Sequence, residues 1–137
     1  MVLGVKKIRL ARLIRTDADI KAAVKAWCGE WECDYIKGGK CKVRGDPVAA
    51  EREYGHISQW DTEQVTSMKD LFFCMTEFNE DISRWRVHNV RDMHKMFYGA
   101  RSFNQDLSGW DVRKVRDMAW MFDDTDSLEK KPSWYEE

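Results

Sequence analysis

The clearest pattern along the chain is a set of apolar positions that recurs every 25 residues between residues 57 and 131. Three copies cover residues 57–81, 82–106 and 107–131, and they are repeats 1, 2 and 3 from here on. A period of this length is typical of architectures in which each unit buries its apolar face against its neighbours. We therefore expect like side chains to stack in columns. The columns are Trp60, Trp85 and Trp110; Met68, Met93 and Met118; and Phe72, Phe97 and Phe122.

Within each repeat the spacing changes partway. The stretch Phe-Asn-x-Asp-Ile/Leu-Ser-x-Trp alternates apolar and polar residues, which predicts a short strand. The stretch Val-x-x-Met-x-x-Leu/Met-Phe has helical spacing, which predicts one or two helical turns, with Ser67, Asp92 and Asp117 at the N-cap. The predicted fold class is therefore an α/β repeat, a short solenoid whose strands lie roughly 4.8 Å apart in a parallel ladder with the Trp column buried.

The segments outside the repeats predict caps. Residues 1–56 would hold a strand over Val5–Ile14, a helix over residues 17–28 that closes the N-terminal end of the stack, and a Cys-containing loop. The pair Gly38-Gly39 indicates a hairpin or loop, and Pro47 would start a short helix over residues 47–53.

Residues 132–137 are expected to form a C-terminal cap or tail. Pro132 falls where Ile57 would recur, and Tyr135 falls where Trp60 would. A decayed copy beside a charged tail is typical of the capping unit that a stack of repeats requires.

Two segments carry a family resemblance. The residues over Val90–Ala100, VRDMHKMFYGA, and over Phe103–Val112, FNQDLSGWDV, are similar to the repeat of the BspA-like leucine-rich-repeat family, the bacterial surface protein type also found in mycoplasma and Listeria lipoproteins and in algal and protist proteins. The resemblance covers roughly residues 54–128. It implies a short leucine-rich-repeat solenoid with an N-terminal helical cap, a buried Trp column, and a role in adhesion or scaffolding.

Charge and hydropathy narrow the classes of partner. With 23 basic and 24 acidic side chains the formal charge is -1, which argues against a general nucleic-acid binder. No apolar run approaches the roughly 20 residues that span a bilayer, so membrane insertion is not expected. The basic N-terminus lacks the apolar segment of a signal peptide. We therefore expect an intracellular protein, cytoplasmic or organellar, while the family resemblance leaves a surface location open.

The exposed positions of repeats 2 and 3 form the candidate binding surface. Arg91 and Arg116 share a column, so stacking would align them in a positive stripe for an acidic protein partner. The alternative is a solvated face paired with Asp92 and Asp117. Trp120 does not recur in the repeat and is a candidate exposed aromatic contact. The basic residues of the surface are Arg84, Arg86, His88, Arg91, Arg113, Lys114 and Arg116.

The cysteines do not indicate a metal site. Cys28, Cys33 and Cys41 follow the spacing C-x4-C-x7-C, and Cys74 lies apart, whereas most structural zinc sites use paired C-x2-C ligands. We expect reduced structural thiols, and the alternative is a disulfide between Cys33 and Cys41 that would link the two sides of the loop in an oxidising compartment.

The remaining polar motifs indicate structure. Asn79 and Asn104 recur where side chains can satisfy backbone groups at the corner of a repeat. No nucleophile–base pair, metal triad or phosphate-binding loop is recognisable, so we expect no enzyme activity, no cofactor and no small-molecule substrate. The leading hypothesis is a non-enzymatic protein–protein interaction module or a small structural or accessory subunit of a larger assembly. The alternatives are a secreted or surface adhesin-like protein and a nucleic-acid-associated accessory protein that uses the basic stripe.

Overall fold

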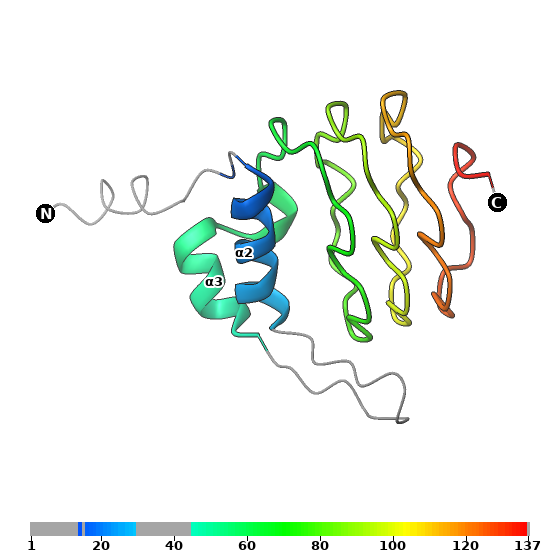
Figure 1. The fold of residues 1–137 in the computed structure, drawn as a ribbon. Helices are drawn as coiled ribbons and strands as arrows, with labels where there is room; N and C mark the ends of the chain where they lie inside the picture. Colours follow the sequence, from blue (N-terminus) through cyan, green and yellow to red (C-terminus); the bar gives the residue numbers. More distant parts are fainter. Residues whose placement is uncertain (1–13, 15, 30–44, 137) are drawn as a thin grey trace, which may run out of the picture.

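Two α-helices lie at one end of the described structure, and the three repeats follow side by side toward the C-terminus (Figure 1). The computed structural model describes Ile14, residues 16–29 and residues 45–136. Its elements are helix α2 (Asp17–Cys28), helix α3 (Pro47–Tyr54) and the 3-10 helix η2 (Ile57–Gln59). The predicted strand over Val5–Ile14, apart from Ile14 itself, and the predicted hairpin at Gly38-Gly39 lie outside the described residues.

Helix α2 confirms the helix predicted over residues 17–28. It begins after Thr16, whose Oγ1 accepts the N–H of Asp19 at 3.1 Å, and ends at Gly29, whose left-handed φ of 96° stops the helix. Its apolar face, which includes Ile20, Val24 and Trp27, is buried against the rest of the core. Local capping and periodicity therefore determine this helix.

Helix α3 confirms the short helix predicted over residues 47–53, one residue longer than expected. Pro47 lies in its first turn, where a missing N–H costs nothing, and Asp46 Oδ1 accepts the N–H of Ala49 at 3.0 Å. Gly55, with φ of 77°, ends the helix and turns the chain into repeat 1.

The prediction of an α/β leucine-rich-repeat solenoid is wrong. The part of the chain that the structure describes contains no strand and no sheet, and its repeats contain no α-helix. The only β-type pairing among these residues is two isolated parallel bridges, between Ser67 and Asp92 and between Asp92 and Asp117. The predicted strands before each Trp are irregular chain, and in repeat 1 η2 takes that place.

Consecutive turns replace the predicted helical turns because a residue in this part of each repeat has a left-handed backbone conformation. Asp70, Lys95 and Trp120 have φ of 56°, 51° and 55°, and this left-handed conformation interrupts a right-handed helix. The N–H of Leu71 closes a tight turn on Met68 O at 3.2 Å, while the N–H of Met68 points outward to Asp92 O of the next repeat at 2.8 Å. Alternate amides thus bond between repeats, so they cannot bond along a helix.

The residues predicted as helix N-caps have a related role. Asp92 and Asp117 each accept the N–H two residues further on, from His94 and Ala119, at 2.9 Å. Ser67 accepts the N–H of Lys69 at 3.4 Å. These are side-chain turns that compete with helix formation, because they satisfy the backbone locally in a non-helical conformation.

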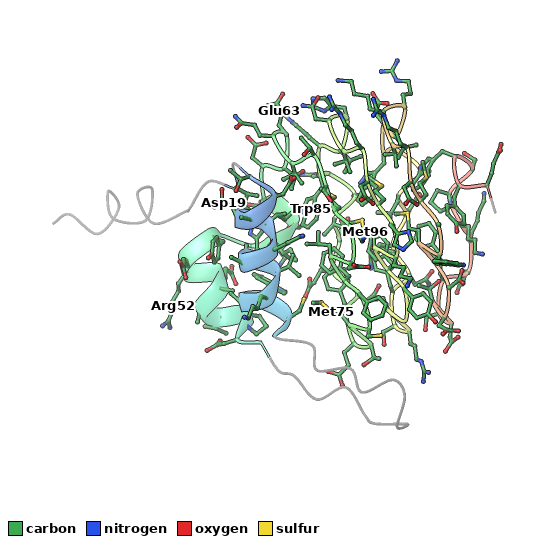
Figure 2. All side chains as sticks on the ribbon, in the orientation of Figure 1. Asp19, Arg52, Glu63, Met75, Trp85 and Met96 are labelled. Atoms are coloured by element: carbon green, nitrogen blue, oxygen red, sulfur yellow. The ribbon has the colours of Figure 1, made fainter. Side chains whose placement is uncertain are left out.

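Like side chains lie above one another along the stack. The rings of Phe72 and Phe97 are 5.4 Å apart, and those of Phe97 and Phe122 are 5.5 Å apart and nearly parallel. Trp60, Trp85 and Trp110 are buried, and Figure 2 shows Trp85 and Met96 within the stack. Because stacked apolar side chains exclude water from both faces, these columns form the core.

The indoles of Trp85 and Trp110 also link adjacent repeats. The Nε1–H of Trp85 donates to Ile57 O at 2.8 Å, and that of Trp110 donates to Ile82 O at 3.2 Å. The buried donors are therefore satisfied by the carbonyl one repeat earlier, which ties the side-chain column to the backbone.

The C-terminal residues continue the Trp column with a shift of one position. The backbone keeps its register, because the N–H of Tyr135 donates to Pro132 O at 3.0 Å. The ring that stacks on Trp110, at 6.3 Å, belongs to Trp134, and its Nε1–H donates to Leu107 O at 2.9 Å. Tyr135 instead packs edge-on against Phe122. The 25-residue period places Tyr135 at the Trp position of this last copy, so the prediction from the sequence missed Trp134.

Candidate interaction surface

Arg91 and Arg116 form the core of the predicted basic stripe. The N–H of Arg91 donates to Thr66 O and the N–H of Arg116 donates to Arg91 O, each at 2.8 Å. The two arginines therefore lie directly beside each other in adjacent repeats. Both are exposed, and neither guanidinium makes an ion pair or hydrogen bond with the residues that the structure describes.

Two other members of the stripe lie beside an acid of repeat 1. Arg86 Nη1 lies 3.2 Å from Glu63 Oε2, and His88 Nε2 lies 3.8 Å from Glu63 Oε1. Since Glu63 precedes His88 in the same column, stacking itself brings the acid and the bases together. This pairing was not predicted, because the acid and its partners belong to different repeats.

Arg113 is neutralised within its own turn. Its Nε and Nη2 donate to the two carboxylate oxygens of Asp111 at 2.8 and 2.7 Å. The side-chain and backbone hydrogen bonds from Arg113 lower the pKa of Asp111 to about 2. Lys114 Nζ donates to Asn89 Oδ1 at 3.1 Å, and this contact leaves its positive charge uncompensated.

The alternative pairing with Asp92 and Asp117 is not formed with Arg91 or Arg116 among the described residues. Asp92 accepts a backbone N–H, and Asp117 accepts the N–H of Ala119 and lies 3.3 Å from His94 Nδ1. Arg84, also predicted for the stripe, is exposed, and its charge contributes to lowering the pKa of Asp81 after the hydrogen bonds from Ser83. The basic members of the stripe that make no ion pair with a described residue are therefore Arg84, Arg91, Lys114 and Arg116.

Trp120 is exposed at the C-terminal end of the stack. Its side chain retains 53% of its accessible surface, in contrast with the buried Trp column. Lys95 Nζ lies 5.0 Å from its ring centroid and the His94 ring lies at 5.4 Å. Trp120 shares the left-handed backbone conformation of Asp70 and Lys95, with φ of 55°.

The Ser–His contact at the first repeat was missed by sequence reasoning. Ser58 Oγ lies 2.7 Å from His56 Nδ1, and the N–H of Ser58 donates to the same nitrogen at 3.2 Å. The nitrogen therefore caps η2. The described residues give His56 no carboxylate partner that would orient it as a general base.

Cysteine chemistry is constrained where the structure describes it. Cys33 and Cys41, the predicted disulfide pair, lie outside the described residues. Neither Cys28 nor Cys74 forms a disulfide, and burial raises the pKa of Cys28 to about 12, with Glu80 adding to the rise. A protonated thiol is a poor nucleophile at neutral pH. Over residues 16–29 and 45–136, no group of three or more His, Cys, Asp or Glu side chains is placed to hold a metal ion.

A cavity of about 520 Å³ lies between α2 and repeat 1. Its described lining combines Lys21, Lys25, Lys69 and Asp70 with apolar side chains that include Val24 and Leu71. Segments far apart in the chain form it, so the spacing of residues gave no sign of it. No helix in the described part of the chain is long and apolar enough to cross a membrane.

Comparison with known families gives one match. A family model described as "Mycoplasma protein of unknown function, DUF285" matches residues 48–136, from the start of α3 to the end of the described chain. No curated protein and no solved structure matches the chain. The matched range includes all three repeats and every residue of the basic stripe.

Proposed function

The chain belongs to this family of unknown function, and we propose that it is a non-enzymatic protein–protein interaction module or a small structural subunit of a larger assembly. In either role it docks an acidic partner surface through Arg91 and Arg116. The family match reaches over 48–136 and therefore contains the proposed surface. The partner is defined by its chemistry: a protein face with carboxylates spaced to meet two guanidinium groups.

The observation that carries the proposal is the pair of adjacent, exposed and uncompensated arginines. Their backbones are held one repeat apart by the hydrogen bonds Arg91 N–H to Thr66 O and Arg116 N–H to Arg91 O. A guanidinium binds a carboxylate with two parallel hydrogen bonds, so two aligned arginines can select both charge and geometry. Lys114 beside them extends the same positive field.

The recurring Asn and Asp side chains serve the structure of the repeats. Asn79 Oδ1 accepts the N–H of Asn104 at 2.8 Å, and Asn104 Oδ1 accepts the N–H of Glu129 at 3.2 Å. Asp81 and Asp106 accept the amides of Ser83 and Ser108. These groups maintain the turns of the repeats. The resemblance to BspA-like repeats adds an expectation of adhesion or scaffolding.

The experiment starts from the native protein. We would purify it from its own source, determine the native mass and identify its neighbours by cross-linking and mass spectrometry. Affinity for the co-purified partner would then be compared for wild type and the double variant Arg91→Glu/Arg116→Glu. We expect a loss of about tenfold or more, because reversal converts attraction into repulsion.

The matched control is Arg52→Glu/Lys130→Glu, which changes net charge equally at exposed positions on α3 and at the end of repeat 3. The proposal predicts that this control retains most of its affinity. An equal loss in both variants, or no loss in either, would contradict it. Nuclease-sensitive capture that weakens steeply with salt would favour the nucleic-acid alternative instead.

A further inference from the structure

The cavity between α2 and repeat 1, of about 520 Å³, combines exposed charges with buried apolar side chains. Lys21 on α2 and Lys69 on repeat 1 both line it and are both exposed. Val24 and Leu71 line it as buried side chains, and Met75, on the side of repeat 1 that faces α2, is partly buried (Figure 2). A volume of this size lies in the range of pockets that hold a small organic molecule.

The charges of the lining favour an anion. Three lysines, Lys21, Lys25 and Lys69, contribute to it against one carboxylate, that of Asp70. Neither Lys21 nor Lys69 forms an ion pair or a hydrogen bond through its ammonium group with a residue that the structure describes. Asp17, one turn before Lys21 on α2, directs its carboxylate to amides of repeat 1. A ligand carboxylate can therefore pair with both lysines without displacing a protein carboxylate.

Two backbone carbonyls of repeat 1 face the same side. In repeat 2 the carbonyls of His94 and Met96 accept amides of the preceding repeat at 2.9 and 2.8 Å. The equivalent carbonyls of repeat 1 belong to Lys69 and Leu71, and in the same register they point away from repeat 2, toward α2. Neither accepts a hydrogen bond within the described ranges. The wall of the cavity therefore offers two acceptors to a ligand that carries an N–H group.

The position of α2 limits the size of the occupant. Asp17 accepts the amides of Thr66 and Ser67 at 2.7 and 3.1 Å, and the ring of Trp27 lies 6.0 Å from that of Trp60. A repeat from a second copy of the chain would have to break these contacts before its backbone could reach the two carbonyls. The cavity is therefore suited to a small molecule or to the end of a chain.

The three features of the cavity select one chemical class. A carboxylate meets the lysines, an N–H group meets the open carbonyls, and an apolar group meets the buried side chains. Inorganic phosphate supplies only the charge. A fatty acid supplies charge and apolar surface but leaves the carbonyls without a donor, which costs binding free energy. An N-acylated amino acid with an apolar side chain supplies all three, and so does the last residue of a peptide.

We propose that this cavity binds an N-acylated amino acid with an apolar side chain, either as the free compound or as the C-terminal residue of a peptide. Its carboxylate pairs with Lys21 and Lys69, and its N–H donates to one of the two open carbonyls. Its apolar side chain packs against Val24 and Met75. This site is separate from the surface used in the proposed function and does not depend on it.

The test titrates the full chain, labelled with ¹⁵N, with N-acetyl-leucine and follows the backbone amide resonances by NMR. We expect saturable shifts at the residues that line the cavity, including Lys21, Lys69 and Leu71, and no comparable shifts at Arg91 and Arg116. This pattern would locate the ligand between α2 and repeat 1.

Two analogues each remove one feature of the ligand. N-acetyl-leucine methyl ester lacks the charge, and 2-acetoxy-4-methylpentanoate has an oxygen in place of the N–H. Each should bind about fivefold or more weakly than N-acetyl-leucine, because each leaves a group of the cavity without its partner. N-octanoyl-leucine and a tetrapeptide that ends in leucine distinguish the two sources, since the tighter binder identifies the natural form. Amidation of the tetrapeptide's C-terminus should weaken its binding as the methyl ester does.

Protein variants test the lysines. Lys21→Gln/Lys69→Gln should lower the affinity for N-acetyl-leucine about tenfold or more, because it removes both cations that pair with the carboxylate. The matched control is Arg52→Gln/Lys130→Gln, which changes the net charge equally at exposed positions outside the described lining and should retain the affinity.

The variant that tests the proposed function should not affect this site. Arg91→Glu/Arg116→Glu should bind N-acetyl-leucine as wild type does, so failure of the proposed function and failure of this inference are distinguishable. Replacing residues 31–43 by a glycine–serine linker of equal length should also leave the affinity unchanged. A gain of about tenfold or more in that variant would make a segment of this chain the occupant and overturn the inference.

Three further results would overturn it. N-acetyl-leucine could cause no saturable shift at the cavity at millimolar concentration. Inorganic phosphate could shift the same resonances with equal affinity, which would leave only a site for negative charge. Octanoate or the oxygen analogue could bind as tightly as N-acetyl-leucine, which would show that the open carbonyls select nothing.

Discussion

The two ends of the repeat stack are closed in different ways. At the N-terminal end, Trp27 of α2 and Tyr54 of α3 pack on Trp60, each with ring centroids 6.0 Å apart. The indole N–H of Trp60 donates to Gly55 O at 2.9 Å, in place of the carbonyl of an earlier repeat. At the C-terminal end, Trp134 covers Trp110, but the amides of Met118 and Trp120 have no partner in the described chain.

The comparison shows how a helix can end a stack of repeats. Asp17 Oδ1 accepts the N–H of Thr66 at 2.7 Å, just as Thr66 O accepts from Arg91 and Arg91 O accepts from Arg116. A carboxylate on α2 therefore substitutes for a missing backbone carbonyl. The C-terminal residues supply aromatic cover, and the Tyr135 hydroxyl bonds to the backbone of Met121 and Phe122, but the described residues supply no acceptor for the Met118 and Trp120 amides.

The largest expected effect comes from removing a central ring and comparing it with a terminal one. Trp85→Ala should lower the free energy of unfolding by about 3–5 kcal/mol, because it empties a buried site and removes the hydrogen bond to Ile57 O. Trp134→Ala, at the half-buried end of the column, should cost about 1–2 kcal/mol. Urea denaturation followed by circular dichroism measures both.

If Trp85→Ala does not fold, Trp85→Phe takes its place. This variant keeps a ring but loses the indole donor, so its loss of stability should lie between those expected for Trp85→Ala and Trp134→Ala. Equal losses at Trp85 and Trp134 would show that the two ends and the middle of the stack are held equally. The expected difference in stabilisation between the centre and the C-terminal end of the stack would then be wrong.

The hydrogen bonds between Asp17 of α2 and repeat 1 should have a smaller effect on stability, and this effect should depend on pH. Asp17→Ala removes three hydrogen bonds to Thr66 and Ser67 and should cost about 1–2 kcal/mol. Partial burial raises the pKa of Asp17, but hydrogen bonds from Thr66 and Ser67 and the nearby Lys21 outweigh it, so the pKa lies below its ordinary value.

Because the folded state holds Asp17 ionised to lower pH than the unfolded state does, the stabilisation is present above about pH 4 and is lost as pH falls through the lower, folded pKa. Asp17→Asn has no proton to bind, so the stability difference between it and wild type should shrink on acidification. A difference that stays constant between pH 6 and pH 2.5 in urea denaturation series would contradict this role.

The last comparison concerns left-handed residues within the repeats, and the smallest effect is expected at Asp70. Gly99 has φ of 70°, and a Cβ there would lie 3.2 Å from Cys74 Sγ, so Gly99→Ala should cost about 1–2 kcal/mol. Asp70 has φ of 56° with a side chain, so Asp70→Gly should stabilise by about 0.5–1 kcal/mol. Thermal unfolding measures the stability of each variant. Asp70→Ala is the control, because it keeps a Cβ and should therefore gain no stability.

Much of the organisation was predictable from the sequence. The period of 25 residues identifies which Trp, Met and Phe residues share a column, and the structure places these columns in the core, although Met118 is only partly buried. The helical spacing of residues 17–28 located α2, and Pro47 located α3. These features depend on local spacing and on identical residues in identical environments, and both are properties of the sequence itself.

The conformation of the repeats was decided by tertiary structure. Apolar residues at i, i+3 and i+7 suit a helix, but the same spacing suits consecutive turns whose alternate amides bond to the next repeat, as Met68 and Phe72 do. The pairing of Glu63 with Arg86, the role of Asp17 and the shift to Trp134 arise in the same way. In each case the deciding partner lies in another repeat or in α2, and local pattern contains no information about a partner that only stacking brings within reach.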